Sequence, residues 1–227
     1  MPKTFMIGEY TITKVLTGEP WNENCYLVHH SLSGEGVIID PGGAPELIIQ
    51  LVEESGMRLR YILLTHAHHD HVGAVAGVCR QFGLPCQLHM GDARLLRQAP
   101  MYALRFAGTQ IEPPEPVVIY DGQPVLELGS QSISVIHTPG HTKGSVCIDF
   151  GSFVFTGDTL LYLHVGRTDL PGGDAAQLAT SISQLVGNMP EESILFPGHG
   201  RAWTISDALV WWRELVVAPP QYDGTVA

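Results

Sequence analysis

The chain has 227 residues, of which 44% are hydrophobic and 15% are charged. This composition excludes a disordered chain, and the length allows a sizeable core, so we expect a single domain over residues 1–227. Twelve basic residues against 23 acidic ones give a formal net charge of −11, which argues against a nucleic-acid partner because phosphate binding needs a basic surface.

The first residues show no signal-peptide pattern, and no run of 18 apolar residues occurs, so we expect a cytoplasmic protein with no membrane partner. The cysteines form no C-x-x-C pair, and we expect them to be buried, inert thiols.

The first half of the chain alternates short apolar runs with longer periodic ones. The runs predict strands at 10–17, 24–30, 34–40, 61–65 and 85–90, with helices at 45–56 and 71–83 and near 91–97. Residues 98–116 are rich in proline and predict a long surface loop or lid. Its Met101, Tyr102 and Phe106 either line a substrate entrance or pack the loop onto the domain.

The second half repeats the order of strands first and helices later. It predicts strands at 125–128, 133–138, 145–150, 152–157 and 193–198, with helices at 174–187 and 206–217. Asp174 and Ser206 are the expected N-caps of these helices. Two sheets packed face to face, with helices outside, satisfy this order and give an α+β fold.

One pattern recurs at four strand ends. An apolar strand stops, a Gly, Pro or Thr follows, and a His or Asp comes next. Loops that leave one edge of a sheet cluster in space, so we expect these side chains to converge. The candidates are His66, His68, Asp70, His71, His141, Asp158 and His199. His69 would point away from its neighbours in an extended loop, and we expect it to be a bystander.

Seven imidazoles and carboxylates suit Zn²⁺, Fe or Mn. One catalytic zinc needs only three protein ligands, so seven suffice for two divalent metals that share a carboxylate. We expect zinc, with iron and manganese as alternatives.

The motifs "NCYLV", "DPGG", "THAHHDH", "HTPGHTKGS", "FTGDTL", "GRTDLPGGD" and "FPGHG" together resemble the metallo-β-lactamase superfamily, in the family's order and over nearly the whole chain. The resemblance implies a four-layer αββα sandwich. It also implies that one metal is held by His66, His68 and His141 and the second by Asp70, His71 and His199. Asp158 would bridge the two metals, and Asp40 would support the metal loops.

Within the superfamily, "GRTDLPGGD" is similar to the glyoxalase II-like branch, including its small single-domain bacterial members. There a basic residue at the place of Arg167 helps to bind the substrate's carboxylate, which a guanidinium can hold by two hydrogen bonds. A salt bridge to Asp169 or Asp174 is the alternative role. Only about 28 residues follow His199, so the C-terminal helical region typical of glyoxalase II is not expected here.

The resemblance implies hydrolysis of a thioester such as S-lactoylglutathione by a metal-bound hydroxide, with Asp70 orienting that hydroxide. A lactonase or other ester hydrolase of the same fold is one alternative. A persulfide dioxygenase, with one iron held by His66, His141 and Asp158, is another. We expect a small-molecule ester or thioester as the partner and leave a homodimer open.

Overall fold

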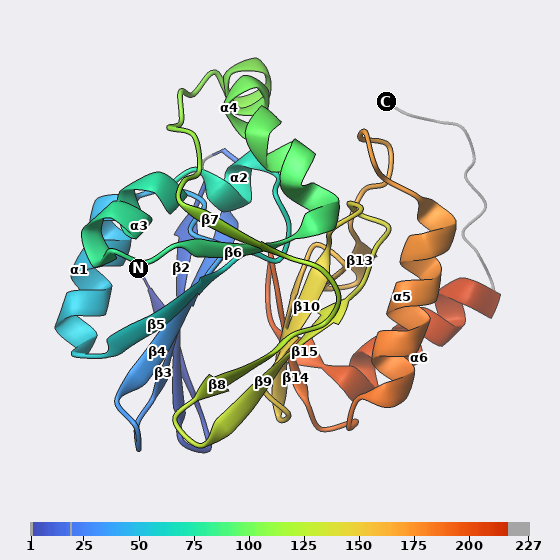
Figure 1. Cartoon of the computed structure of the whole chain (residues 1–227). Coiled ribbons are helices and arrows are strands. Elements are labelled where there is room, and N and C mark those ends of the chain that lie inside the picture. The colour runs from blue at the N-terminus through green and yellow to red at the C-terminus, as the bar shows by residue number, and fades with distance from the viewer. Residues whose placement is uncertain (1, 19, 218–227) are drawn as a thin grey trace.

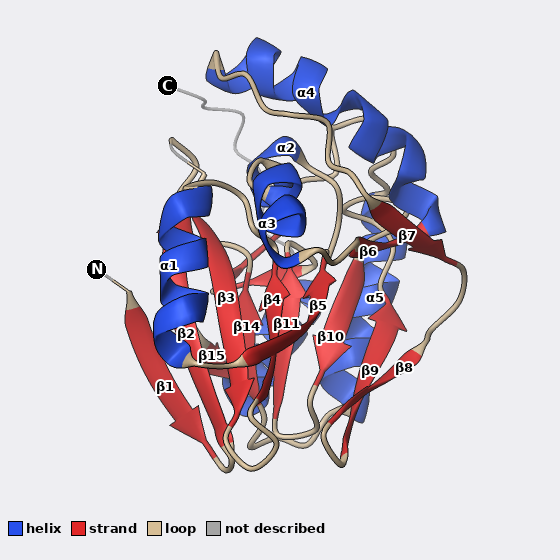
Figure 2. Ribbon diagram, turned by 60° about the vertical axis from the view of Figure 1, so that its left-hand side comes forward, coloured by secondary structure: helices blue, strands red, loops and turns tan. Residues whose placement is uncertain are grey.

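Two β-sheets face each other at the centre of the molecule, and helices cover the outer face of each (Figures 1 and 2). This computed structural model describes residues 2–18 and 20–217. The four layers run helix, sheet, sheet, helix. The predicted αββα sandwich is therefore confirmed.

The first sheet has seven strands, and their spatial order is their order in the chain. The first four pair antiparallel through tight connections, and the last three join in parallel through helices. The strands are β1 (Lys3–Ile7), β2 (Tyr10–Thr17), β3 (Glu23–His30), β4 (Glu35–Ile39), β5 (Arg58–Leu63), β6 (Cys86–His89) and β7 (Val117–Tyr120).

The second sheet has six strands in the order β15-β14-β11-β10-β9-β8, with only β11 and β14 parallel. They are β8 (Val125–Leu128), β9 (Gln131–His137), β10 (Val146–Asp149), β11 (Phe153–Gly157), β14 (Ile194–Pro197) and β15 (Trp203–Thr204). A small separate hairpin consists of β12 (Leu160–Leu161) and β13 (His164–Val165).

Helices lie against both sheets, as Figure 1 shows. On the side of the first sheet are α1 (Pro45–Ser55), α2 (His69–Val72), α3 (Val75–Phe82) and α4 (Ala93–Ala107), with a 3₁₀ turn at Met90–Asp92 before α4. On the side of the second sheet are α5 (Ala175–Asn188) and α6 (Ile205–Val217).

Three apolar clusters correspond to the three spaces between the layers. Aromatic rings fill the space between the sheets, where Phe155 and Phe196 stack at 5.4 Å and both are fully buried. Alternating strand residues point either into this space or outward to the helices, so central strands such as β3, β4 and β11 bury both faces. The rigid double sheet fixes the positions of its strand ends, and those ends carry the candidate site.

The expected surface loop at 98–116 is wrong in its first half, because α4 continues to Ala107. Pro100 lies inside this helix, although an interior proline costs about 3 kcal/mol. The apolar face formed by Leu96, Ala99 and Ala103 is buried against the domain and offsets that cost. Residues 108–116 contain no helix or strand.

The expected helix at 71–83 is interrupted between α2 and α3. There the backbone N–H of Ala74 donates to the carbonyl of Pro41 at 2.9 Å instead of continuing the helical ladder. Gly73 lies so close to the carbonyl of Gly42 that a Cβ at this position would overlap it. A tertiary contact therefore breaks an apolar pattern that is continuous in the sequence.

The edge strands β1, β7 and β15 and the hairpin strands β12 and β13 were not predicted. The sequences of β1 and β7 do not alternate regularly between apolar and polar residues, and the other three strands have only two residues each. Asp174 is the N-cap of α5, as predicted, and accepts from the N–H groups of Ala176 and Gln177. The N-cap prediction at Ser206 is wrong. α6 starts at Ile205, and the hydroxyl of Thr204 accepts from the N–H of Asp207 at 3.1 Å.

All four cysteines are buried, and none forms a disulfide. Within residues 2–18 and 20–217, no helix combines the length and the apolar character needed to cross a membrane.

Candidate metal centre

The four segments with the recurring pattern leave the same edge of the double sheet. They follow β5, β9, β11 and β14, and α2 and α4 lie beyond that edge (Figures 1 and 2). All seven predicted ligands come together there, although the chain separates the first from the last by more than half its length.

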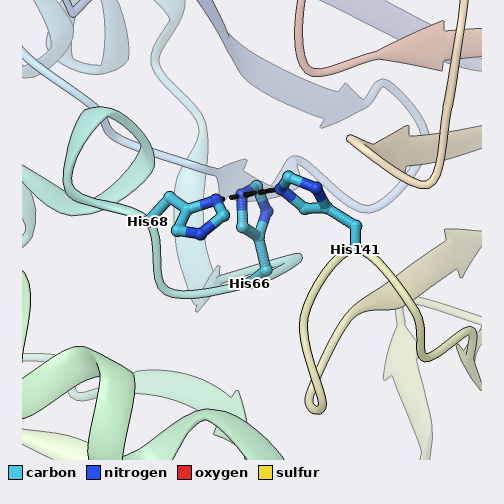
Figure 3. A group of neighbouring side chains, drawn as sticks. All are labelled: His66, His68 and His141. Atoms are coloured by element: carbon cyan, nitrogen blue, oxygen red, sulfur yellow. Dashed lines mark hydrogen bonds between the residues drawn. The ribbon is translucent and has the colours of Figure 1, made fainter. Parts of the chain in front are cut away.

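The first cluster consists of His66, His68 and His141, whose rings point toward one another (Figure 3). Nε2 of His141 lies 3.2 Å from Nε2 of His66 and 2.9 Å from Nδ1 of His68. His66 and His141 are 1% and 2% exposed, so both side chains are almost completely shielded from solvent. Three ring nitrogens therefore converge on one small space.

The second cluster consists of Asp70, His71 and His199. Nε2 of His71 and Nε2 of His199 are 3.3 Å apart, and Oδ2 of Asp70 lies 3.4 Å from Nε2 of His199. Asp70 and His71 belong to the short helix α2, whereas His199 follows β14 from the other sheet. The cluster thus joins the two halves of the sandwich.

Asp158 lies between the clusters. Its Oδ2 is 3.6 Å from Nε2 of His141 in the first cluster and 3.6 Å from Nε2 of His199 in the second. Its Oδ1 is buried and accepts no hydrogen bond from the described residues. A Cβ at Gly198 would overlap that oxygen and lie 2.7 Å from the His71 ring, so only glycine allows this approach.

Hydrogen bonds on the far side of the rings decide which nitrogen carries the lone pair. Nδ1 of His141 donates to the carbonyl of Arg167 at 2.8 Å, and Nδ1 of His199 donates to the carbonyl of Trp21 at 3.1 Å. A carbonyl oxygen can only accept, so the neutral form of each ring has its lone pair on Nε2, facing the cluster. Nδ1 of His66 is likewise 3.1 Å from the hydroxyl of Thr65, which donates to Asp40.

The charge states also suit a metal. Burial lowers the pKa of His66 well below its usual value, and burial together with His141 lowers the pKa of His68 to about 3, so both rings are neutral donors. Burial opposes ionisation of Asp158, but nearby His71 and His199 lower the pKa of its carboxyl and keep it charged. The Nε2 lone pairs of neutral His66 and His141, 3.2 Å apart, repel each other unless a proton or a metal cation lies between them.

The second cluster attracts positive charge more strongly. Burial alone would lower the pKa of His71, but Asp158 and the hydrogen bond to Asp40 raise it well above its usual value. The pKa of His199 is raised in the same way, by Asp158 and Asp70 against the effect of burial. Protons and divalent metals compete for these lone pairs, so the donors of both clusters fit two metal ions.

Asp40 braces the side of the site near His71. Its carboxylate accepts from the N–H of Thr65 at 2.7 Å, from the Thr65 hydroxyl and from Nδ1 of His71 at 3.0 Å. Asp40 has a φ of 50°, which is rare for a non-glycine residue and costs energy. That backbone turn after β4 directs the side chain to the loop after β5, where it holds the ring of His71, a candidate ligand.

Asp92 braces the first cluster in the same manner, and no sequence motif singles it out. Its buried carboxylate accepts from the N–H of Ala67 at 3.0 Å, from the hydroxyl of Thr142 at 2.8 Å and from the N–H of Gly144 at 2.7 Å. It therefore ties the loop that carries His66 and His68 to the loop that carries His141.

Glu23 is a second buried carboxylate that sequence reasoning missed. It is fully buried, its Oε2 accepts from the hydroxyl of Thr17, and its Oε1 lies 4.0 Å from Nδ1 of His71. Burial raises the pKa of its carboxyl well above the usual value. It could be recognised only from the three-dimensional structure, because in the sequence it is a single glutamate at the start of a strand.

A pocket of about 300 Å³ opens above the two clusters. Its base contains ligand candidates from both clusters, and its walls are mainly apolar. The other side chains that line it are Trp21, His69, Leu95, Tyr102, Phe106, Arg167, Leu170 and Pro171.

The remaining predicted residues have mixed outcomes. Arg167 lines the pocket, but its guanidinium forms two 2.7 Å hydrogen bonds with Asp169, which was the alternative role. His69 belongs to neither cluster, although it forms part of the wall. Tyr102 and Phe106 line the pocket, whereas Met101 is exposed beside it and does not.

The chain is similar to known proteins over most of its length. The family model described as Metallo-beta-lactamase superfamily matches residues 18–199. Hydroxyacylglutathione hydrolase GloC of Haemophilus influenzae is 35% identical over 190 residues, which cover 82% of this chain and 89% of that protein.

Two solved structures are also similar. The B3 metallo-beta-lactamase BLEG-1 is 34% identical with a TM-score of 0.79, covering 92% of this chain and 98% of its own. TTHA1623, in a di-iron-bound form, is 39% identical with a TM-score of 0.74, covering 84% of this chain and 93% of its own.

Proposed function

The chain belongs to the metallo-beta-lactamase superfamily, and from this we propose that it is a glyoxalase II-like hydrolase that cleaves a small thioester such as S-lactoylglutathione. In this proposal His66, His68 and His141 hold one divalent metal ion, and Asp70, His71 and His199 hold the other. Asp158, which lies 3.6 Å from His141 of one cluster and 3.6 Å from His199 of the other, would be available to both metal ions.

One observation carries the proposal: two adjoining clusters of three candidate ligands lie on either side of a shared carboxylate at the base of a pocket. Each cluster alone has the three protein ligands that a catalytic zinc requires. A pair of divalent metals, when bound, polarises a carbonyl and lowers the pKa of bound water toward 7. The clusters thus suit hydrolysis at neutral pH.

The other residues support attack on a carbonyl carbon. The charged carboxylate of Asp70 forms part of the pocket and can accept a hydrogen bond from the attacking water, which fixes the direction of the oxygen lone pair. Apolar walls exclude competing water and strengthen these electrostatic interactions. Asp70 is therefore the residue that we assign to orientation of the nucleophile.

Thioesters fit this site better than amides. A thiolate leaves with a conjugate-acid pKa of about 8.5, so it needs little help from an acid at neutral pH, whereas an amide nitrogen must be protonated. Most of the ionisable side chains that line the described pocket are assigned to metals, and the others are His69, Tyr102 and Arg167. The name of the relative GloC, a hydroxyacylglutathione hydrolase, supports the same substrate class.

Arg167 would bind the substrate's carboxylate only by exchanging its partner. The present pair with Asp169 is exposed, so its loss costs little. A substrate carboxylate could then take the place of the Asp169 carboxylate on the same two N–H groups.

The test uses protein loaded in turn with zinc, iron and manganese, with metal content measured by mass spectrometry. We expect two metals per chain, with zinc most active, and hydrolysis of S-lactoylglutathione. Asp70→Ala should abolish turnover, whereas Asp121→Ala, an exposed carboxylate on the surface, should not.

Other outcomes identify the alternatives. Turnover of lactones or oxygen esters in place of thioesters would assign a lactonase or esterase. The assignment of zinc as the metal would still stand. One iron per chain with oxygen uptake on glutathione persulfide would replace the proposal by a persulfide dioxygenase. The di-iron-bound form of TTHA1623 makes the iron-loaded sample an essential part of the experiment.

A further inference from the structure

We propose that the pocket contains an aromatic subsite, formed by Trp21, Tyr102, Phe106 and their apolar neighbours, that selects thioesters with an uncharged aromatic or bulky apolar acyl group. The inference rests on the proposed thioester hydrolysis and adds which acyl groups the enzyme prefers.

Aromatic rings form a continuous row along one wall of the pocket. Tyr102 and Phe106 stack on α4 with centroids 5.8 Å apart and an angle of 10°. The ring of His69 lies 6.2 Å from Phe106 and 6.2 Å from Trp21, so it links α4 to the loop between β2 and β3. Aromatic rings at such distances attract another ring by stacking or edge contacts.

These rings are unusually accessible for their size. Phe106 is 46% exposed and Trp21 is 43% exposed, although both are large apolar side chains next to the candidate catalytic groups. Leu95 from α4 and the pair Leu170 and Pro171 complete the apolar lining. Covering this surface with an apolar group contributes about 25 cal/mol per Å² of buried area, so it offers binding energy to an apolar ligand.

The charges in the pocket argue against a charged acyl group. Among the described residues that line it, Arg167 is the only one with a lysine or arginine side chain, and in the proposed function a carboxylate of the substrate's thiol carrier takes it, so no cation is left in the wall for an acyl carboxylate. A charged acyl group would also have to leave water for a wall that is mainly apolar. An uncharged acyl group meets neither penalty.

The size of the pocket determines which end of the substrate enters. A volume of about 300 Å³ lies at the small end of ligand pockets, so it can hold one ring or branched chain but not a peptide-like thiol as well. The acyl group is the part that is small and apolar enough to be enclosed. The thiol carrier then extends through the open mouth of the pocket.

The experiment compares two substrates that differ only in this group. S-Mandeloylglutathione carries a phenyl ring where S-lactoylglutathione carries a methyl group, and both keep the same hydroxyl and the same thiol. We expect kcat/KM for the mandeloyl substrate to exceed that for the lactoyl substrate by about tenfold or more. S-Succinylglutathione, with a charged acyl group, should be the slowest of the three.

Variants locate the preference. Phe106→Ala should lower the mandeloyl-to-lactoyl ratio of kcat/KM at least fivefold, mainly through KM for the mandeloyl substrate, with metal content unchanged. Leu104→Ala is the matched control, because Leu104 is 57% exposed on the same helix and does not line the pocket. Leu104→Ala should leave the mandeloyl-to-lactoyl ratio of kcat/KM the same as in the unsubstituted protein.

A binding measurement separates failure of the subsite from failure of the reaction. Neutral phenylacetamide should bind to the metal-loaded protein in saturation-transfer NMR, more tightly than propionamide, and Phe106→Ala should weaken it at least fivefold. Thioester turnover without a phenyl preference overturns the subsite and leaves the reaction standing. Phenylacetamide binding that depends on Phe106, without turnover of any thioester, supports the subsite and overturns the reaction. Loss of both readouts overturns both proposals.

Discussion

The base of the pocket and its aromatic wall differ in how firmly they are held. At the base, His66, His71 and His141 are at most 2% exposed, and each ring is fixed by a hydrogen bond on its far side. On the wall, Trp21 and Phe106 are more than 40% exposed and are held by ring contacts. The two regions touch, yet one is part of the core and the other part of the surface.

The wall can therefore vary in sequence without loss of the base. The base requires strained and buried elements, such as the φ of 50° at Asp40 and the buried carboxylate of Glu23, and each depends on several partners. The wall residues come from a helix and a loop outside the double sheet, where substitutions disturb little. Chemistry is thus fixed by the base, and substrate choice is left to the wall.

The largest effect is expected on the free energy of unfolding, when a substitution in the core is compared with one in the aromatic wall. Phe155 is fully buried between the sheets, so Phe155→Ala should lower the free energy of unfolding by about 3–5 kcal/mol. Phe106→Ala on the wall should change it by no more than about 0.5 kcal/mol. Urea denaturation measures both. Equal losses would show that the wall is part of the folding core.

Substitution of one candidate ligand tests whether metal binding at the base of the pocket requires it. His141→Ala should release one metal equivalent and lower activity by at least about 100-fold. Loss of a residue that only supports a metal ligand already costs about 10- to 100-fold, and loss of the ligand itself should cost at least as much. His164→Ala, an exposed histidine on β13, is the matched control and should retain both metals. Metal content by mass spectrometry provides the readout. Two metals retained by His141→Ala would remove His141 from the ligand set.

Substitution of Asp92 should lower the metal affinity of the first cluster and leave that of the second nearly unchanged. In Asp92→Asn, the amide NH₂ would face an N–H of Ala67 or Gly144, so the loops of His66, His68 and His141 would lose a common anchor. Metal affinity at that cluster should fall about 10- to 100-fold, with the second cluster little affected.

Zinc titration against a competing chelator resolves the two affinities. Asp121→Asn, an exposed aspartate, is the control and should change neither. An equal loss at both clusters would show that Asp92 supports the fold as a whole and not the first cluster.

The smallest effect is expected for an ion pair at the surface. Arg80 and Glu112 contact each other at 2.9 Å, but both are exposed to solvent, unlike the charged groups at the base. Arg80→Ala should change the free energy of unfolding far less than Phe155→Ala does. The change should vanish when the urea denaturation is repeated in 1 M salt. A large loss that persists in high salt would show that this pair is not screened as its exposure implies.

Much of this arrangement could be predicted from the sequence. The four strand ends followed by His or Asp predicted the convergence of seven side chains, because strand ends of packed sheets meet at one edge. The strand and helix order predicted the sandwich. The N-cap at Asp174 was predicted from a local hydrogen bond that needs no tertiary partner.

The failures share a cause. α4 extends through Pro100 because burial of Leu96, Ala99 and Ala103 outweighs a local preference. The helix at 71–83 breaks because Ala74 donates to Pro41, thirty-three positions earlier. In both cases a contact with a distant part of the chain overrides the local pattern.

The sequence by itself determined the fold class and the identity of the candidate ligands, since hydrophobic periodicity and ligand type are local properties. The tertiary structure identified Asp92 and Glu23 as buried carboxylates, chose Asp169 over Asp174 as the partner of Arg167, and placed the aromatic wall over the two clusters. Burial and partnership depend on segments that meet only after folding, so no spacing within the chain can specify them.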